Sequence, residues 1–298
     1  MTPTPIRPLP EALAVGWREH RLDRPQGRLR YVTAGEGPPL VLCHGFIGSA
    51  ENFETWVPRL STRRLLVMPD LPGFGASEPL ARAHTSRALA GEVLALIDAL
   101  QLTQFDLGGL CLGASVALEL LAMVPKRVGR LVLHTPLLAP AAMARSYLVQ
   151  ARLATVPGAF QLLSFLGRRR VVADLYRRLA VEAGSEVDRR AADLNFANQL
   201  RAHPRAAREW LRNGIGEDFR VLLQVWPGQV AVLAAADDRL LELGRVAEFC
   251  GQRPRTEMSV IPSAGHGWDL ELIRRQLDVL EDFLGAGEAA GGRARAGR

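Results

Sequence analysis

One cysteine of this chain stands in a pattern that suits nucleophilic catalysis. Cys111 is flanked by Gly109 and Gly113, follows a short apolar run and precedes a helical pattern over 116–122. Glycines at these two positions let a strand and a helix approach closely around a sharp turn. Such a turn strains its central residue, and the N-terminus of the following helix favours a thiolate there. The pattern predicts a nucleophile elbow, although a five-residue pattern alone equally fits a buried structural cysteine.

Acidic residues and a histidine follow at places that complete a catalytic set. Asp237 and Asp238 come after the apolar run 229–234, and His266 comes after the run 257–261. Nucleophilic acyl chemistry needs a base that activates the nucleophile and an acid that orients the base. The sequence therefore predicts a cysteine–histidine–aspartate triad in which either aspartate is a candidate.

Alternating patterns indicate the elements that position these residues. Apolar runs predict strands at 17–22, 29–33, 40–43, 65–68, 130–134, 229–234 and 257–261, with a further strand from Phe105 into the elbow. Helical spacing predicts helices from 51 or 52 to 60, from 85 or 86 to 100, over 116–122 and over 269–284. Strands that alternate with helices predict an α/β fold whose mostly parallel sheet is covered on both faces.

The alternation stops between the strands at 130–134 and 229–234. A helical pattern fills this segment, which is far longer than an ordinary connection. We therefore expect a core formed by 1–135 and 229–284, a helical cap at 136–228 and a disordered tail at 285–298. Three cap phenylalanines are candidates to face the site, although a helical cap also needs such residues for its own packing: Phe160, Phe165 and Phe196.

Taken together, the motifs resemble those of the α/β-hydrolase superfamily. The resemblance is to capped members, namely meta-cleavage-product hydrolases and haloperoxidase-like esterases, and it covers about 29–284. It rests on His44-Gly45-Phe46, on 70–77, on the elbow, on the Asp238 region and on Gly265-His266. The sequence departs from the usual pattern in two ways. Cys111 replaces serine, as in dienelactone hydrolases and polyhydroxyalkanoate synthases, and Ala235 replaces the glycine before the acid.

The resemblance implies roles for individual residues. Alignment of the strand end at Ala235 places the acid at Asp238, with Asp237 as the alternative. The backbone amides of Phe46 and Leu112 are implied to form the oxyanion hole. The residues implied to support the pocket or its loops are His44, Gly45, His134 and Trp268. The histidines outside these motifs, His20, His84 and His203, are expected at the surface or at helix ends.

A cysteine nucleophile narrows the expected substrates. In a tetrahedral intermediate a thiolate leaves more easily than an alkoxide, so the substrate needs a good leaving group. We expect hydrolysis of activated carboxylic esters or thioesters, such as aryl esters, enol esters and lactones, through a thioester acyl-enzyme. The substrate is expected to be a small, apolar acyl compound. An acyltransferase with the same acyl-enzyme and a catalytically silent ligand-binding member of the fold are the alternatives.

Composition excludes several other classes. The chain has 37 Lys+Arg and 31 Asp+Glu, a net charge of +6, but the basic residues are spread along the chain, and nucleic-acid binding is not expected. Its 3 cysteines are scattered, so neither a disulfide framework nor a metal site is expected, and no cofactor is implied. No apolar run is long enough to span a bilayer, and no signal peptide is evident. We expect a cytoplasmic protein without a membrane partner, and the oligomeric state stays open.

Overall fold

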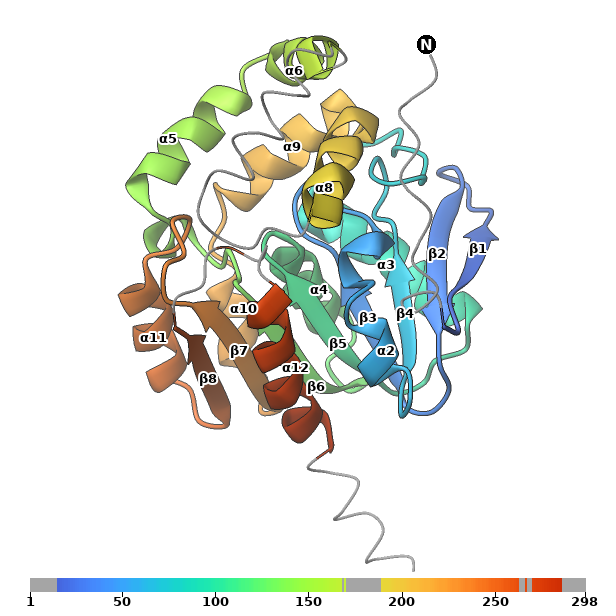
Figure 1. Cartoon of the computed structure of the whole chain (residues 1–298), viewed down its shortest axis with the longest axis vertical. Coiled ribbons are helices and arrows are strands. Elements are labelled where there is room, and N and C mark those ends of the chain that lie inside the picture. Colours follow the sequence, from blue (N-terminus) through green and yellow to red (C-terminus); the bar gives the residue numbers. More distant parts are fainter. Residues whose placement is uncertain (1–14, 168, 170–188, 263–265, 267–269, 286–298) are drawn as a thin grey trace, which may run out of the picture.

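An eight-stranded sheet lies at the centre of the structure (Figure 1). The computed structural model describes residues 15–167, 169, 189–262, 266 and 270–285. The strands are β1 (Arg18–Leu22), β2 (Leu29–Ala34), β3 (Pro39–Cys43), β4 (Leu65–Pro69), β5 (Phe105–Leu110), β6 (Val128–His134), β7 (Gln229–Ala235) and β8 (Thr256–Ile261). Their order across the sheet is β1-β2-β4-β3-β5-β6-β7-β8. Only the β1–β2 and β2–β4 pairs are antiparallel, so the expected mostly parallel sheet is confirmed.

Side chains of successive strand residues enter two separate hydrophobic layers. In β3, Val41 and Cys43 belong to one layer, whereas Leu40 and Leu42 belong to the other. This is the period of two that a strand imposes. Both layers are apolar because a parallel sheet is covered on both faces, which explains why its inner strands read as continuous apolar runs.

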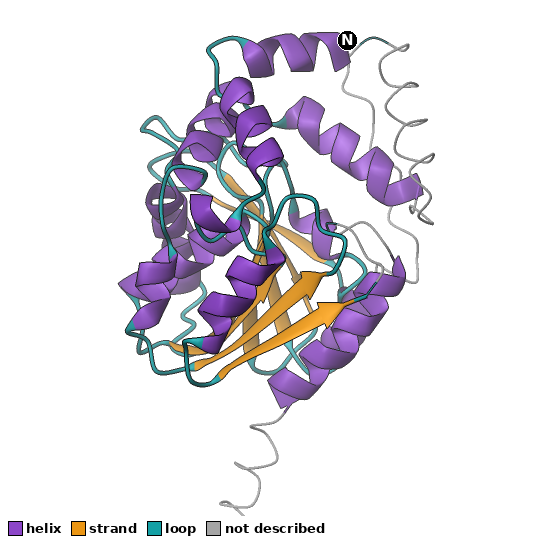
Figure 2. Ribbon diagram, turned by 90° about the vertical axis from the view of Figure 1, so that its left-hand side faces the viewer, coloured by secondary structure: helices purple, strands orange, loops and turns teal. Residues whose placement is uncertain are grey.

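Helices cover the two faces of the sheet (Figure 2). The first layer lies under α3 (Ser86–Ala99), α4 (Gly113–Met123), α10 (Arg220–Gln224) and α11 (Leu243–Gly251). The second lies under η1 (Ala50–Phe53), α2 (Val57–Leu60) and α12 (Leu270–Gly285). The single helix expected from 51 or 52 to 60 is thus wrong, because a 3-10 turn ends at Phe53 and a new helix begins at Val57. Pro58, at the start of α2, has no amide hydrogen and is tolerated only in a first turn.

The remaining helices lie above the carboxyl ends of the parallel strands (Figure 1). They are η2 (Pro140–Ala142), α5 (Arg145–Ala154), α6 (Ala159–Gly167), α8 (Arg189–Arg201) and α9 (Pro204–Gly214). Helix α10 falls in the same stretch of sequence but packs on α4, below this group. All described elements between β6 and β7 are helical, which is the pattern expected of the cap.

Helix α9 is attached to the core through buried polar groups. His84 lies at a helix end, directly before the N-cap of α3, but it is fully buried and not at the surface. Its Nε2 accepts a hydrogen bond from the Leu80 amide at 2.9 Å, and its Nδ1 lies 3.0 Å from a carboxylate oxygen of Glu209 on α9. Burial lowers the pKa of His84, which keeps the ring neutral and Nδ1 the donor. The amide of His203, just before α9, donates to Gly73 at 2.8 Å.

Candidate active site

Cys111 occupies the turn between β5 and α4 in a left-handed backbone conformation. Its φ is +52°, which a residue with a side chain adopts only under strain. The flanking glycines make this turn feasible. A Cβ at Gly109 would lie 2.6 Å from the Ala114 Cα, and one at Gly113 would lie 2.3 Å from the His44 carbonyl oxygen. The Cys111 amide donates to the His134 carbonyl at 2.8 Å, which ties the turn to the end of β6.

His266 and Asp238 meet above the ends of β7 and β8. The Nδ1 of His266 lies 2.7 Å from Oδ2 of Asp238, and the exposed fractions of the two side chains are 16% and 1%. The other carboxylate oxygen, Oδ1, accepts from the Leu240 amide at 2.8 Å, which fixes the carboxylate plane. Asp237 is exposed, so of the two candidate acids only Asp238 contacts the imidazole.

The second imidazole nitrogen of His266 is left for Cys111. Nε2 is buried and has no hydrogen-bond partner of full geometry among the described residues. Burial lowers the pKa of His266, but the charge of Cys111 and the hydrogen bond to Asp238 outweigh it and raise the pKa to about 10. The site therefore stabilises an imidazolium between a sulfur and a carboxylate, an arrangement that suits proton transfer from a thiol.

Two backbone amides close to the sulfur have no internal acceptor. The amides of Phe46 and Leu112 donate no hydrogen bond to any described residue. Gly45 lies so close to the elbow that a Cβ there would be 3.1 Å from the Cys111 Cβ. Unpaired amides beside a candidate nucleophile are the feature that an oxyanion hole requires.

His44 braces the loop that carries these amides. Its Nδ1 lies 2.8 Å from the Gly45 carbonyl oxygen, and its Nε2 accepts from the Leu71 amide at 2.9 Å. Burial lowers the pKa of His44 to about 4, so the ring is neutral. His44 thus links the loop after β3 to the loop after β4, as a supporting residue should.

His134 has a different environment. Its side chain is 3% exposed, packs against the Trp56 ring at a centroid distance of 5.8 Å and is hydrogen bonded to Gln276 of α12. Burial lowers the pKa of His134 to about 4. Its backbone carbonyl holds Cys111, as described above. Trp268, the last residue expected to support the pocket, lies outside the described residues.

The cap phenylalanines do not all face the same way. The Phe160 ring is buried and contacts the Phe46 ring edge-on, with centroids 5.9 Å apart. Phe196 is buried too, whereas Phe165 is 57% exposed. The expectation for Phe165 is therefore wrong. Its position in α6 turns the side chain outward. Helical spacing alone cannot predict this, because the buried face of α6 depends on the elements that pack against it.

Trp210 of α9 connects the cap to the loop of the unpaired Phe46 amide. It is fully buried, and its ring lies 6.1 Å from the Phe46 ring and 5.1 Å from the Phe74 ring. Its indole nitrogen donates to the Ser86 hydroxyl at 3.2 Å. A tryptophan in an amphipathic helix carries no sequence signal for such a role, which is why the sequence did not reveal it.

Tyr147 of α5 is a second residue that the sequence did not reveal. Burial, followed by the charge of Cys111, raises the pKa of its hydroxyl, so the phenol stays neutral near the sulfur. Two backbone hydrogen bonds bring α5 there. The Leu137 amide donates to the Cys111 carbonyl at 3.2 Å, and the Ala144 amide donates to the Leu240 carbonyl at 2.9 Å. The chain between β6 and α5 therefore runs from the elbow to the loop after β7.

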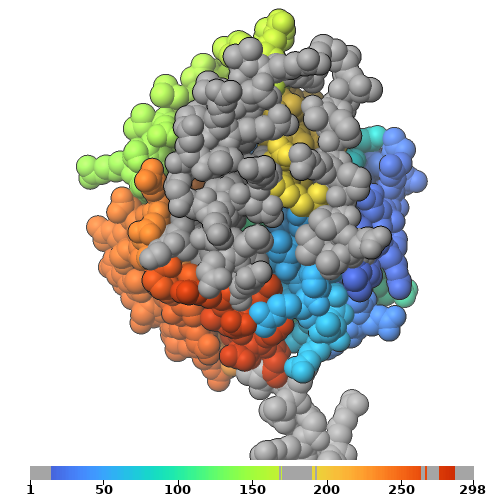
Figure 3. All heavy atoms as spheres, in the orientation of Figure 1, coloured from blue at the N-terminus to red at the C-terminus, as the bar shows by residue number. Residues whose placement is uncertain are grey.

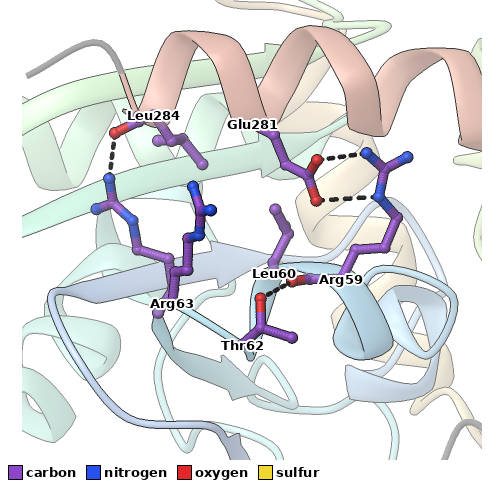
Figure 4. A pocket seen from close by; sticks show the side chains of 8 residues that line it. Arg59, Leu60, Thr62, Arg63, Glu281 and Leu284 are labelled. Atoms are coloured by element: carbon purple, nitrogen blue, oxygen red, sulfur yellow. Dashed lines mark hydrogen bonds and ion pairs between the residues drawn. The ribbon is translucent and has the colours of Figure 1, made fainter. Parts of the chain in front are cut away.

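A pocket of about 200 Å³ lies elsewhere, between α2 and α12 (Figure 4). Of the three arginines that line it, Arg59 and Arg64 are paired, whereas Arg63 forms no ion pair with any described residue. Arg59 bonds to Glu281 through Nε at 2.9 Å, and Arg64 bonds to Asp106 at 2.7 Å and to the Leu284 carbonyl. Within the part of the chain that the structure describes, no three His, Cys, Asp or Glu residues are grouped as metal ligands.

Comparisons with known proteins agree with this fold. The family model described as the alpha/beta hydrolase fold matches residues 38–268. The dihydrolipoyllysine-residue acetyltransferase component of the acetoin cleaving system of Pseudomonas putida is 30% identical over 285 residues, which cover 93% of this chain and 70% of that protein. The 2-hydroxymuconate semialdehyde hydrolase of Pseudomonas sp. strain CF600 is 27% identical over 265 residues, 86% of this chain and 90% of that enzyme. The crystal structure of the enol-lactonase from Burkholderia xenovorans LB400 superposes with a TM-score of 0.71 at 18% identity, covering 89% of this chain and 99% of that one, a likeness of fold.

Proposed function

We propose that this chain, which belongs to the α/β-hydrolase family, hydrolyses activated carboxylic esters or thioesters with Cys111 as the nucleophile. The family expected from the motifs is thereby confirmed, and homologues of the meta-cleavage-product type are among its relatives. One observation carries the finer proposal. A strained cysteine at the elbow shares a site with a buried His266–Asp238 pair that is 2.7 Å apart.

In the first half of the reaction, Nε2 of His266 takes the proton of the Cys111 thiol. The resulting imidazolium is stabilised by Asp238, which accepts the Nδ1 hydrogen bond. The thiolate attacks the substrate carbonyl, a C–S bond forms, and the carbonyl electron pair moves to oxygen. The amides of Phe46 and Leu112 then donate to that oxyanion, an interaction worth about 3 kcal/mol per donor in other acyl-transfer enzymes.

The second half regenerates the enzyme. The intermediate collapses, the leaving group departs with the proton from His266, and a thioester acyl-enzyme remains. Water attacks this thioester while His266 takes a proton from it, and the acid product leaves as Cys111 regains its proton. Each proton that His266 accepts is returned, so the cycle needs no cofactor.

The choice of cysteine supports activated substrates. Collapse of the intermediate expels the weaker base, and a thiolate is a weaker base than an alkoxide. Aryl esters, enol esters, enol lactones and thioesters carry leaving groups that compete with Cys111, whereas simple alkyl esters do not. The name of the enol-lactonase describes an enol lactone as substrate, which carries a leaving group of this kind.

Intact-protein mass spectrometry tests this proposal. We expect p-nitrophenyl or thioester donors to add one acyl mass to the protein, mapped to the Cys111 peptide, and turnover to follow. Cys43 and Cys250 are internal controls, because burial raises the pKa of their thiols to about 12 and about 11. The proposal fails if Cys111→Ala keeps full turnover. If Cys111→Ser is as active as the parent, the leaving-group argument fails.

Acyl transfer is a second candidate, favoured by the acetyltransferase component that is 30% identical over 93% of this chain. It uses the same acyl-enzyme but passes the acyl group to an alcohol, amine or thiol. Product analysis with an added acceptor separates the two, since a transferase forms the acyl-acceptor product in preference to the free acid. Absence of both turnover and adduct would instead support a silent binding protein.

A further inference from the structure

Large apolar side chains gather on the outer face of α5 and α6. Among the described residues, 11 large hydrophobic side chains are exposed, and 7 of them fall between 149 and 166. They are Val149, Leu153, Val156, Leu162, Leu163, Phe165 and Leu166, with exposed fractions from 41% to 65%. We call these seven residues the outer cap patch. A cluster of this density is unusual for a surface that faces only water.

Helical spacing explains why the patch faces one way. Val149 and Leu153 are four residues apart on α5, and Leu162 and Leu166 are four apart on α6, so each pair shares a helix face. The opposite faces bury Ala151 and Phe160. Both helices therefore have an inner apolar face that the protein covers and an outer apolar face that it leaves open.

The charge around the outer cap patch has a single sign. The sequence contains no aspartate or glutamate between Glu119 and Asp174. Arg145, Arg152 and Arg169 are exposed along the two helices, and none of them forms an ion pair within the described part of the chain. The Arg169 guanidinium lies over the Phe165 ring, 5.1 Å from its centroid, so cation and apolar surface are adjacent.

The patch also lies at an extremity of the molecule. Figure 1 shows α6 at the top of the structure and α5 along its upper left side, and Figure 3 shows the same yellow-green segment on the upper left rim. A protruding face of this kind can meet a flat surface without hindrance from the core.

We propose that the outer cap patch docks α5 and α6 on an anionic lipid surface. Apolar side chains flanked by arginines are the composition of helices that lie in a membrane interface, where the chains enter the acyl boundary and the arginines meet phosphate. A second copy of this chain fits less well, because each copy would bring the exposed Arg145, Arg152 and Arg169 to the contact and no acidic residue from α5 or α6. No helix of the described residues is long and apolar enough to cross a bilayer, so the contact is peripheral. This partner departs from our sequence-based expectation, which weighed only spanning segments.

Docking would place the lipid next to the candidate active site. Helix α5 carries Val149 and Leu153 on its outer side, while Tyr147 of the same helix lies near Cys111. An apolar acyl compound dissolved in the bilayer would then reach the candidate active site by passing between the cap helices. The docking itself does not depend on the proposed chemistry.

Vesicle sedimentation with the purified full chain tests the proposal. We expect partition into phosphatidylcholine vesicles that contain phosphatidylglycerol, and much weaker partition into phosphatidylcholine alone. The paired substitution Leu153→Ser and Leu162→Ser should weaken partition about tenfold or more, because two apolar side chains no longer enter the interface. Arg152→Glu should weaken it about fivefold or more, since a charge attracted to the surface becomes one that is repelled.

A matched control separates the patch from general basicity. Val225 is 86% exposed at the end of α10, outside the patch, so Val225→Ser removes a similar apolar side chain and should change partition less than about twofold. A protein of net charge +6 binds anionic vesicles weakly through any basic face. The decisive result is therefore a loss of partition in the Leu153→Ser/Leu162→Ser variant, whose net charge is unchanged. Hydrolysis of a soluble ester should be the same in all variants, which keeps this test apart from the one for Cys111.

Three results would overturn the assignment. The first is no partition into anionic vesicles at low salt. The second is equal partition of the Leu153→Ser/Leu162→Ser variant and the Val225→Ser variant. The third is a concentration-dependent dimer in light scattering that the paired substitution abolishes, which would assign the patch to a second copy.

Discussion

The two neighbouring aspartates after β7 give the sharpest test of the candidate site. We expect Asp238→Asn to lower kcat about a thousandfold and Asp237→Asn to leave it within about twofold. The substitutions are chemically identical and one residue apart, but only Asp238 contacts His266. Both variants should fold, because asparagine keeps the size of the side chain and an oxygen that can accept from the Leu240 amide.

The magnitude follows from the burial of the pair. With charge centres about 4 Å apart, an imidazolium and a carboxylate attract by about 4 kcal/mol at an effective dielectric of about 20, and by about 1 kcal/mol in bulk water. The Asp238 side chain is 1% exposed and that of His266 is 16% exposed, so the first value applies. Since 1.36 kcal/mol is a factor of ten, the loss is about a thousandfold. Asparagine adds a tautomer effect, because its NH₂ group faces Nδ1 and leaves the proton on Nε2, which then cannot accept the thiol proton.

Steady-state turnover of an aryl ester, with melting temperatures of both variants as a folding control, measures the effect. Release of p-nitrophenol reports acylation directly, so a burst followed by slow turnover would show which half-reaction needs the acid. The reasoning is refuted if both variants lose activity equally, or if Asp238→Asn costs less than about fivefold, the value for a solvated pair.

Three further outcomes are expected. Trp210→Ala and Trp226→Ala should each lower the free energy of unfolding by about 4 kcal/mol in urea titrations. Only Trp210→Ala should also lower kcat, because Trp226 lies away from the site. Equal kcat values for the two variants would contradict a supporting role of Trp210. Tyr147→Phe should lower kcat/KM about tenfold with little change in stability, as expected for loss of a neutral donor beside a developing charge, and an unchanged kcat/KM would exclude that role. Burial lowers the pKa of His44 and of His134 from 6.5 to about 4. The stability that each neutral ring contributes is therefore fully present above pH 6.5 and falls by up to about 3 kcal/mol as the pH drops toward 4. A melting temperature that stays constant from pH 6.5 to 4.5 would contradict this.

The sequence predicted well wherever a residue's position depends on its own strand. Cys111 and Asp238 each follow a buried apolar strand, His266 follows the less buried edge strand β8, and parallel strands bring their carboxyl ends to one edge. The fold and the meeting of His266 with Asp238 follow from that rule alone. The strained φ of Cys111 is possible because Gly109 and Gly113 have no Cβ atoms. A Cβ at either position would clash with the neighbouring backbone.

The sequence predicted poorly wherever the position depends on packing between distant elements. His84 is buried only because Glu209 of α9, 125 residues later, covers it. Phe160 and Phe165 lie five residues apart on one helix, and which of them turns inward depends on where α9 and the loop of Phe46 lie. Tyr147 reaches Cys111 because of backbone hydrogen bonds that no local pattern encodes. Tertiary contacts of this kind override local spacing.

The sheet order has a consequence for how the protein is made. Strands β1 to β6 are translated first, and β7 and β8 then extend the sheet at one edge. A nascent chain therefore already carries Cys111 while 111–238 is being completed, before the aspartate and then the histidine are translated. Its sulfur stays poorly reactive toward cellular thioesters until the final strand joins the edge, and a polypeptide truncated before β8 would be inert rather than indiscriminately acylated.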